Sequence, residues 1–130
     1  MKVYLAKFQL NDRVAYKIGH TKFFHAIKRF DDDQYRVFHQ VNVLCDINVQ
    51  HSNASTARLV AKAVEVVLQS VYPKNFRLEE YFLVEDNAFN GLSGITEMFV
   101  LTEGQTEQQI IELFQRAAKK LYWVMEKDNV

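Results

Sequence analysis

Residues 2–9 read Lys-Val-Tyr-Leu-Ala-Lys-Phe-Gln, a run rich in β-branched and aromatic side chains. Such a composition predicts a β-strand. Asn11-Asp12 follows and marks a turn, because both side chains tolerate turn conformations of the backbone. Residues 14–18 then predict the returning strand, and Gly19 is expected to end it. The start of the chain is therefore expected to form a β-hairpin, from which the rest of the fold extends.

A short helix is expected directly after the hairpin. Thr21 is a suitable N-cap for a helix over residues 22–31, because its hydroxyl can accept a hydrogen bond from an otherwise unpaired backbone N–H. At 3.6 residues per turn, Lys22, His25 and Arg29 would fall together on the polar face of this helix. The sequence thus predicts a local basic patch beside the hairpin.

The middle of the chain predicts a strand over residues 35–47 and then a long amphipathic helix. Ser52 or Asn53 can cap this helix, which is expected to reach Tyr72 and to stop at Pro73. Its expected core face consists of Ala57, Val60, Ala61, Val64, Val67, Leu68 and Val71. The polar stripe on the opposite side consists of Arg58, Lys62, Glu65 and Gln69.

The last third of the chain predicts a loop-rich segment and a final helix. Residues 76–85 fit either a strand or a shaped loop, 87–94 form a turn-rich connection, and 95–101 fit a strand. Thr106 with Gln109 resembles a capping box for a helix to about Lys127. Its expected core face is Ile110, Leu113, Phe114, Ala117, Leu121, Tyr122 and Met125. The order of elements predicts an α+β fold with a small, largely antiparallel central sheet flanked by helices.

Composition limits the class of protein. A chain of 130 residues fits a single domain over residues 1–130, and 48% hydrophobic residues predict a packed core. The single cysteine, Cys45, excludes an internal disulfide framework and suits a reducing compartment, so a cytoplasmic protein is expected. No apolar run approaches membrane-spanning length, so no membrane partner is expected. Lys+Arg and Asp+Glu balance at 16 each, whereas phosphate-binding proteins are usually basic. Nucleic-acid binding would therefore depend on the local distribution of charge.

Four segments, in this order, resemble the motifs of the GIY-YIG nuclease superfamily. They are Val3-Tyr4-Leu5, then Tyr16-Lys17-Ile18-Gly19-His20-Thr21, then Arg29 within Ala26-Ile27-Lys28-Arg29-Phe30, and Glu65 within the long helix. A later segment, Gly94-Ile95-Thr96-Glu97-Met98-Phe99, is similar to the Glu-Trp-Phe segment of a phage-rich branch that also favours Lys-Ile-Gly. The resemblance covers residues 2–115. It implies a divalent-metal-dependent endonuclease that acts on DNA in the cytoplasm, which would be the host cytoplasm for a phage protein.

The resemblance also implies a role for each matching residue. Glu65 would bind Mg²⁺ or Mn²⁺, since hard divalent ions prefer carboxylate oxygens. Arg29 would bind the scissile phosphate, because a guanidinium matches phosphate oxygens. Tyr4 would accept or relay the proton of the attacking water, with Lys17 in the place of the second family tyrosine. Gly19 would permit close approach of the substrate, and His20, Lys22 and His25 would contact it.

Each role has a structural alternative. Glu65 could simply pair with Lys62 on a solvated helix face. Arg29 could pair with Asp31, Asp32 or Asp33. Tyr4 could be an ordinary strand aromatic. Since successive strand residues point to opposite faces, Tyr16 and Lys17 cannot both face the site, and we expect Lys17 to face it.

Three departures from the family pattern leave the catalytic activity open. Lys17 replaces the second family tyrosine, Asp33 stands where many members carry His or Tyr, and the family asparagine has no clear counterpart among Asn75, Asn87 and Asn90. The alternatives to an endonuclease are an inactive module of the same fold that binds nucleic acid or protein, and an unrelated α+β interaction protein. Sequence specificity in an endonuclease this small would come from the domain itself or from a homodimer.

Overall fold

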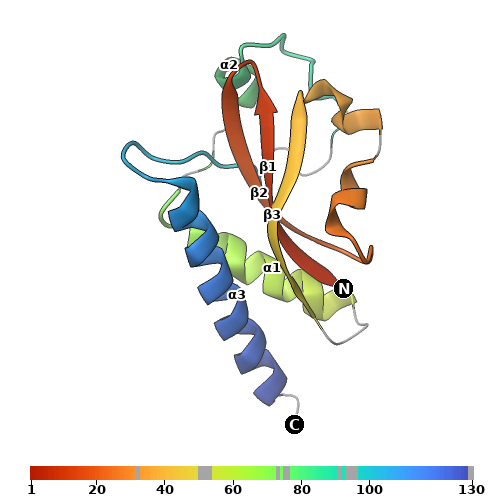
Figure 1. Cartoon of the computed structure of the whole chain (residues 1–130), viewed down its shortest axis with the longest axis vertical. Coiled ribbons are helices and arrows are strands. Elements are labelled where there is room, and N and C mark those ends of the chain that lie inside the picture. The colour runs from red at the N-terminus through yellow and green to blue at the C-terminus, as the bar shows by residue number, and fades with distance from the viewer. Residues whose placement is uncertain are drawn as a thin grey trace.

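A three-stranded antiparallel sheet in the order β2-β1-β3 forms the centre of the molecule (Figure 1). The computed structural model describes residues 1–31, 33–49, 54–72, 74, 77–90, 92 and 97–128. The strands are β1 (Lys2–Leu10), β2 (Arg13–Thr21) and β3 (Gln40–Asn48). The helices are the 3₁₀ helices η1 (Ala26–Phe30) and η2 (Asp33–Val37) and the α-helices α1 (Ala54–Gln69), α2 (Leu78–Phe82) and α3 (Glu107–Asp128). The expected α+β class is confirmed.

The predicted hairpin is present, with a two-residue turn at Asn11 and Asp12. Both residues have positive φ, 51° and 61°, which matches the right-handed twist of the flanking strands. The prediction that Gly19 ends the second strand is wrong. β2 continues to Thr21, and Gly19 pairs with Tyr4 in the sheet. A glycine suits this position inside a strand because it leaves space for the Tyr4 ring, as described below.

The hairpin separates two apolar clusters. Val3, Leu5, Tyr16 and Ile18 pack on one face with α1 and α3. Tyr4, Ala6, Phe8 and Ala15 pack on the other face with η1, η2 and α2. Because side chains alternate along a strand, the two strands of the hairpin contribute to both clusters at once. The free edge of β2 therefore lies between the side of the sheet covered by α1 and α3 and the side covered by η1, η2 and α2.

The expected helix over residues 22–31 is reduced to η1. The Thr21 hydroxyl accepts a hydrogen bond from the N–H of Phe23 at 3.2 Å, but only residues 26–30 become helical. The strand predicted from residue 35 begins at Gln40, because 33–37 form η2. The physical reason is aromatic packing, since Phe30 and Tyr35 lie edge to face at 4.9 Å between ring centroids. Tertiary contacts here outweigh the local preference for a strand.

The segment after α1 is also more helical than predicted. Residues 78–82 form α2, whose Leu78 and Phe82 are buried at i and i+4 on one face, so the strand alternative is wrong there. Residues 86–90 form turns, as expected. No strand forms over the described residues of the predicted segment 95–101. Phe99 makes only isolated antiparallel bridges, with Tyr16 and with Lys74.

Both long helices form where predicted. α1 ends at Gln69, before the expected Tyr72, and its caps Ser52 and Asn53 and its stop Pro73 lie outside the described residues. Five of the expected core residues are buried (Ala57, Val60, Ala61, Val64 and Leu68), whereas Val67 and Val71 are 36% and 44% exposed.

The capping box of α3 is confirmed. The Thr106 N–H donates to Gln109 Oε1 at 2.9 Å, and the Gln109 N–H donates to the Thr106 hydroxyl at 3.2 Å. The buried face of α3 is Ile110, Phe114 and Ala118, with Ala117, Leu113 and Leu121 half-buried; the side chains of Tyr122 and Met125 lie outside the described part. None of the helices in the described residues has the length and apolarity that a bilayer crossing requires.

Candidate active site

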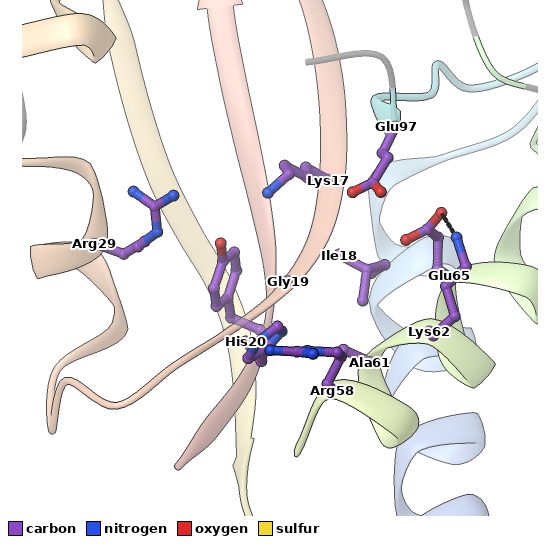
Figure 2. Close-up of a pocket in the computed structure, with 11 residues that line it drawn as sticks. Lys17, Ile18, Gly19, His20, Arg29, Arg58, Ala61, Lys62, Glu65 and Glu97 are labelled. Carbon is purple, nitrogen blue, oxygen red and sulfur yellow. Dashed lines mark hydrogen bonds and ion pairs between the residues drawn. The ribbon is translucent and has the colours of Figure 1, made fainter. Parts of the chain in front are cut away.

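A cavity of about 280 Å³ opens at the free edge of β2, beyond the point where Tyr16 bridges to Phe99. Figure 2 shows its lining, which comes from both sheet faces, from η1, from α1 and from the segment before α3. The lining residues are Tyr4, Lys17, Ile18, Gly19, His20, Arg29, Arg58, Ala61, Lys62, Glu65 and Glu97. Segments distant in the sequence therefore contribute charged groups to one small space.

Tyr4 is held in place by its neighbours. Its ring packs edge to face against Phe30 at 5.4 Å, and the residue is 1% exposed. A Cβ on the paired Gly19 would lie 2.3 Å from the Tyr4 hydroxyl oxygen, so only glycine fits beneath this ring. Burial raises the pKa of Tyr4 to about 12, although the Arg29 guanidinium opposes this. The free phenol is thus protonated in neutral solution.

Lys17 and Tyr16 point to opposite sides, as predicted. Tyr16 is buried in the cluster beneath α1 and α3, and its hydroxyl donates to Glu107 Oε2 at 3.0 Å. Lys17 lines the cavity while only 8% exposed, and it makes no hydrogen bond or ion pair with any residue that the structure describes. Burial lowers the pKa of Lys17, Arg29 lowers it further, and the carboxylates of Glu97 and Glu65 oppose the shift. A buried cation without a partner suits an anionic ligand.

Arg29 extends from η1 toward the same cavity and is half-buried. Its guanidinium lies 5.5 Å from the centroid of the Tyr35 ring, a cation–π contact that restrains the side chain. Within the described residues it forms no ion pair, because Asp33 pairs with Arg36 at 3.1 Å instead. Asp31 forms no ion pair with a described residue, and Asp32, the third alternative partner, lies outside the described residues. Arg29 is therefore oriented while its charge stays open to a ligand.

Glu65 is buried, with 4% of its surface exposed, although Arg58 and Lys62 on the same stripe of α1 are exposed. Lys62 Nζ lies 3.4 Å from Glu65 Oε1, so the pairing that the sequence offered as an alternative is present. Gln69 Nε2 donates to the same oxygen at 3.1 Å. The second oxygen, Oε2, accepts no hydrogen bond from a described residue. Glu65 thus pairs with Lys62 and also lines the cavity, and its Oε2 remains available to bind a cation.

Glu97, Arg58 and Lys62 line the cavity without having been assigned a role from the sequence. The signal for Glu97 was its place in the Glu-Met-Phe segment, and the signal for the other two was the polar stripe of α1 that also holds Glu65. Since that stripe faces the open edge of β2, three of its four members reach the cavity. The sequence predicts the polar stripe of α1, but it does not show that the stripe faces a cavity instead of open solvent.

Two expected substrate contacts do not reach this cavity. Lys22 and His25 are exposed in the segment between β2 and η1, because the helix that would have aligned them with Arg29 does not form there. His25 lines a separate cavity with Lys2 and Phe24. His20 does line the main cavity, and burial together with Arg58, Lys17 and Arg29 lowers its pKa. His20 is consequently a neutral hydrogen-bonding group near pH 7.

The other expected contributors lie elsewhere. Asn87 and Asn90 belong to the turns after α2 and do not line the cavity, and Asn75 lies outside the described residues. No group of three or more His, Cys, Asp or Glu side chains suited to a metal occurs in the described part of the chain. Glu65 and Glu97 nevertheless offer hard oxygen donors, and Mg²⁺ is commonly held by one or two carboxylates with waters and substrate oxygens. The donor set therefore fits such an ion.

Comparison of the chain with protein-family models, with curated proteins and with solved structures gives no match in any of the three.

Proposed function

We propose that this chain is a divalent-metal-dependent endonuclease that hydrolyses phosphodiester bonds in DNA, with a site of the GIY-YIG type. The observation that supports this proposal is the meeting of Tyr4, Lys17, Arg29 and Glu65 at one cavity. These four come from two strands and two separate helices, so their meeting is a property of the tertiary structure. A phenol, two cations and a carboxylate around one small space suit an attack on a phosphodiester.

The cationic half of the cavity suits the phosphate. Lys17 is buried and lacks an anionic partner among the described residues, and Arg29 is oriented by the Tyr35 ring. A phosphodiester placed between them would supply the missing anion and would lose little energy to rearrangement of the side chains. Arg58 and the neutral His20 lie on the same lining, where they can contact neighbouring backbone oxygens.

The carboxylate half suits a cation. A divalent ion bound through Glu65 would neutralise charge on the phosphate and stabilise the leaving oxygen. In the reaction, the oxygen of a water molecule bonds to phosphorus and the bond from phosphorus to the leaving oxygen breaks. Tyr4 relays the proton of the water through its hydroxyl toward solvent, and the leaving oxygen takes a proton from solvent. Because the pKa of Tyr4 is about 12, this relay depends on the cations bound nearby.

A nicking assay tests the proposal. Supercoiled plasmid is incubated with the protein and Mg²⁺ or Mn²⁺, and the same assay is run with Glu65→Gln and Arg29→Ala. We expect metal-dependent nicking that both substitutions reduce by two or more orders of magnitude, as removal of a group that stabilises transition-state charge typically does. Arg36→Ala and Glu80→Gln are matched controls, because both side chains are exposed and lie outside the cavity. Unfolding curves show whether each variant is folded.

The outcomes separate the functional classes. Nicking that persists in both cavity variants contradicts the proposal. Metal-independent DNA binding without any nicking favours a binding module that keeps the fold. The raised pKa of Tyr4 would then account for the missing nicking, because the protonated phenol is a poor proton acceptor. Neither binding nor nicking favours an interaction protein unrelated to nucleic acid.

A further inference from the structure

We propose that Glu97 is a second ligand of the divalent cation and holds it jointly with Glu65. This inference rests on the proposed function and extends it to a residue for which no role was expected. Both carboxylates line the cavity (Figure 2), where the Glu97 carboxylate is drawn between Lys17 and Glu65. Three features of the site support this role: the way in which Glu97 is held, the open oxygens of its carboxylate and the charge on the opposite half of the cavity.

Glu97 is held by backbone contacts on its C-terminal side. Tyr16 and Phe99 exchange two backbone hydrogen bonds, at 2.8 and 2.9 Å, and this bridge joins the segment to β2 next to Lys17. Met98 and Phe99 are both buried. With the next two residues packed in the core, the backbone of Glu97 is anchored on its C-terminal side, where its side chain lines the cavity. This anchoring reduces the entropy that ligand binding would cost.

Gln69 connects the two carboxylate-bearing segments. Its Nε2 donates to Glu65 Oε1 at 3.1 Å and to the backbone oxygen of Glu97 at 3.5 Å. One amide on α1 therefore contacts the first ligand and the main chain of the second. This shared contact links the main chain of Glu97 to α1 beside Glu65, much as outer-sphere hydrogen bonds position metal ligands.

The Glu97 carboxylate makes no hydrogen bond and no ion pair with any residue described in the structure. Glu65 Oε2 accepts no hydrogen bond from the described residues either. Both residues line the same cavity, so their open oxygens face one space. A divalent cation held between the two carboxylates would use these oxygens as ligands.

A simpler role for Glu97 would be that of counterion to Lys17. The two side chains are near enough to influence each other electrostatically, yet they do not form an ion pair. In Figure 2 the Lys17 ammonium is directed to the side of Arg29, away from Glu97. Lys17 is only 8% exposed and lines the cavity without a described ion-pair partner, so an anion bound in the cavity could pair with it. A phosphate bound there would complete the coordination of a cation held by two carboxylates.

Direct measurement of Mn²⁺ binding tests the assignment without any cleavage. The full chain, stripped of metal and without nucleic acid, is titrated with Mn²⁺ by calorimetry and by electron paramagnetic resonance. We expect Glu97→Gln and Glu65→Gln each to weaken Mn²⁺ binding by about tenfold or more. Glu103→Gln is the matched control, since this glutamate is exposed in a turn of the same connection and does not line the cavity. Circular dichroism establishes that each variant is folded.

The outcomes distinguish this inference from the proposed function. Wild-type affinity in Glu97→Gln, together with lost affinity in Glu65→Gln, overturns the role of Glu97 and leaves the nuclease intact. Equal weakening of Mn²⁺ binding in both variants supports the shared site even if plasmid nicking is never observed. The absence of Mn²⁺ binding in the wild-type protein overturns the two-carboxylate site. Loss of folding in Glu97→Gln is resolved by Glu97→Asp, which shortens the side chain but keeps the charge and is expected to bind Mn²⁺ with intermediate affinity.

Discussion

Gly19 leaves the space in which the Tyr4 ring packs, so the choice of residue at this position is restricted by contact rather than by backbone conformation. In Gly19→Ala, the new Cβ would lie 2.3 Å from the Tyr4 hydroxyl oxygen, and the ring must move. We expect a loss of about 1–3 kcal/mol in the free energy of unfolding. We also expect nicking to fall by on the order of tenfold or more, because the phenol is displaced. Urea unfolding and the plasmid assay measure the two effects.

Gly104 provides the control for this substitution. It has φ of +83°, no atom lies within 4 Å of the position that a Cβ would take, and it stands away from the cavity. Gly104→Ala should lower stability by about 1 kcal/mol through backbone strain while nicking stays unchanged. Equal loss of nicking in both variants would show that reduced stability, and not the position of Tyr4, explains the effect.

Lys17→Met tests the cost of a buried ammonium. Burial lowers the pKa of Lys17 below its ordinary value of 10.5, so the folded protein releases this proton at a lower pH than the unfolded chain does. The destabilisation is complete below the folded pKa and disappears as pH rises toward 10.5. We expect Lys17→Met to be more stable than wild type near pH 7 by about 1 kcal/mol, and this advantage to shrink at higher pH. Urea unfolding across the pH range measures it, and an advantage that grows with pH would contradict the assignment.

Site residues on regular strands were predictable, whereas those that depend on tertiary packing were not. Strand alternation is enough to place Lys17 toward the site and Tyr16 in the core. Lys22 and His25 were wrongly grouped with Arg29, because that grouping assumed a helix that forms only from Ala26. No periodicity indicated that Glu97 would meet Glu65, since a bridge between Tyr16 and Phe99 brings them together.

At the scale of elements, the capping box at the start of α3 can be tested by substitution of Thr106. The two reciprocal hydrogen bonds between Thr106 and Gln109 satisfy backbone and side-chain groups at the helix N-terminus. Thr106→Ala should lower the free energy of unfolding by about 1 kcal/mol, because the Gln109 N–H loses its acceptor. Thr106→Ser keeps the hydroxyl and should remain near wild type in urea unfolding. Equal destabilisation by Ala and Ser would locate the effect in the methyl group instead.

Elements with a strong local signal were predictable, and short connecting elements were not. The turn at Asn11 and Asp12, the helix α1 and the capping box of α3 each depend on residues near in sequence. The 3₁₀ helices η1 and η2 exist because Phe30 and Tyr35 must both pack against Phe8. Since Phe8 is far from them in sequence, a local pattern cannot reveal this requirement.

For the whole molecule, the distribution of charge matters more than its sum. The chain carries 16 basic and 16 acidic residues, so little long-range attraction to DNA is expected. The cavity nevertheless gathers Lys17, Arg29 and Arg58 at one edge of the sheet. A protein of this kind should bind DNA through few phosphate contacts, with most of the interaction confined to the site.

The dependence of DNA binding on salt measures this number of contacts. If three cations neutralise phosphates, the logarithm of the binding constant should fall with the logarithm of salt concentration with a slope of about −2.7. Affinity would then drop by about 40-fold between 50 and 200 mM salt. Fluorescence anisotropy with labelled duplex in EDTA measures binding without cleavage. Arg58→Ala should reduce the slope by about 1, whereas Arg36→Ala, outside the cavity and paired with Asp33, should leave it unchanged. A wild-type slope steeper than about −5 would mean that cations elsewhere on the surface dominate, and the confined site would no longer account for binding.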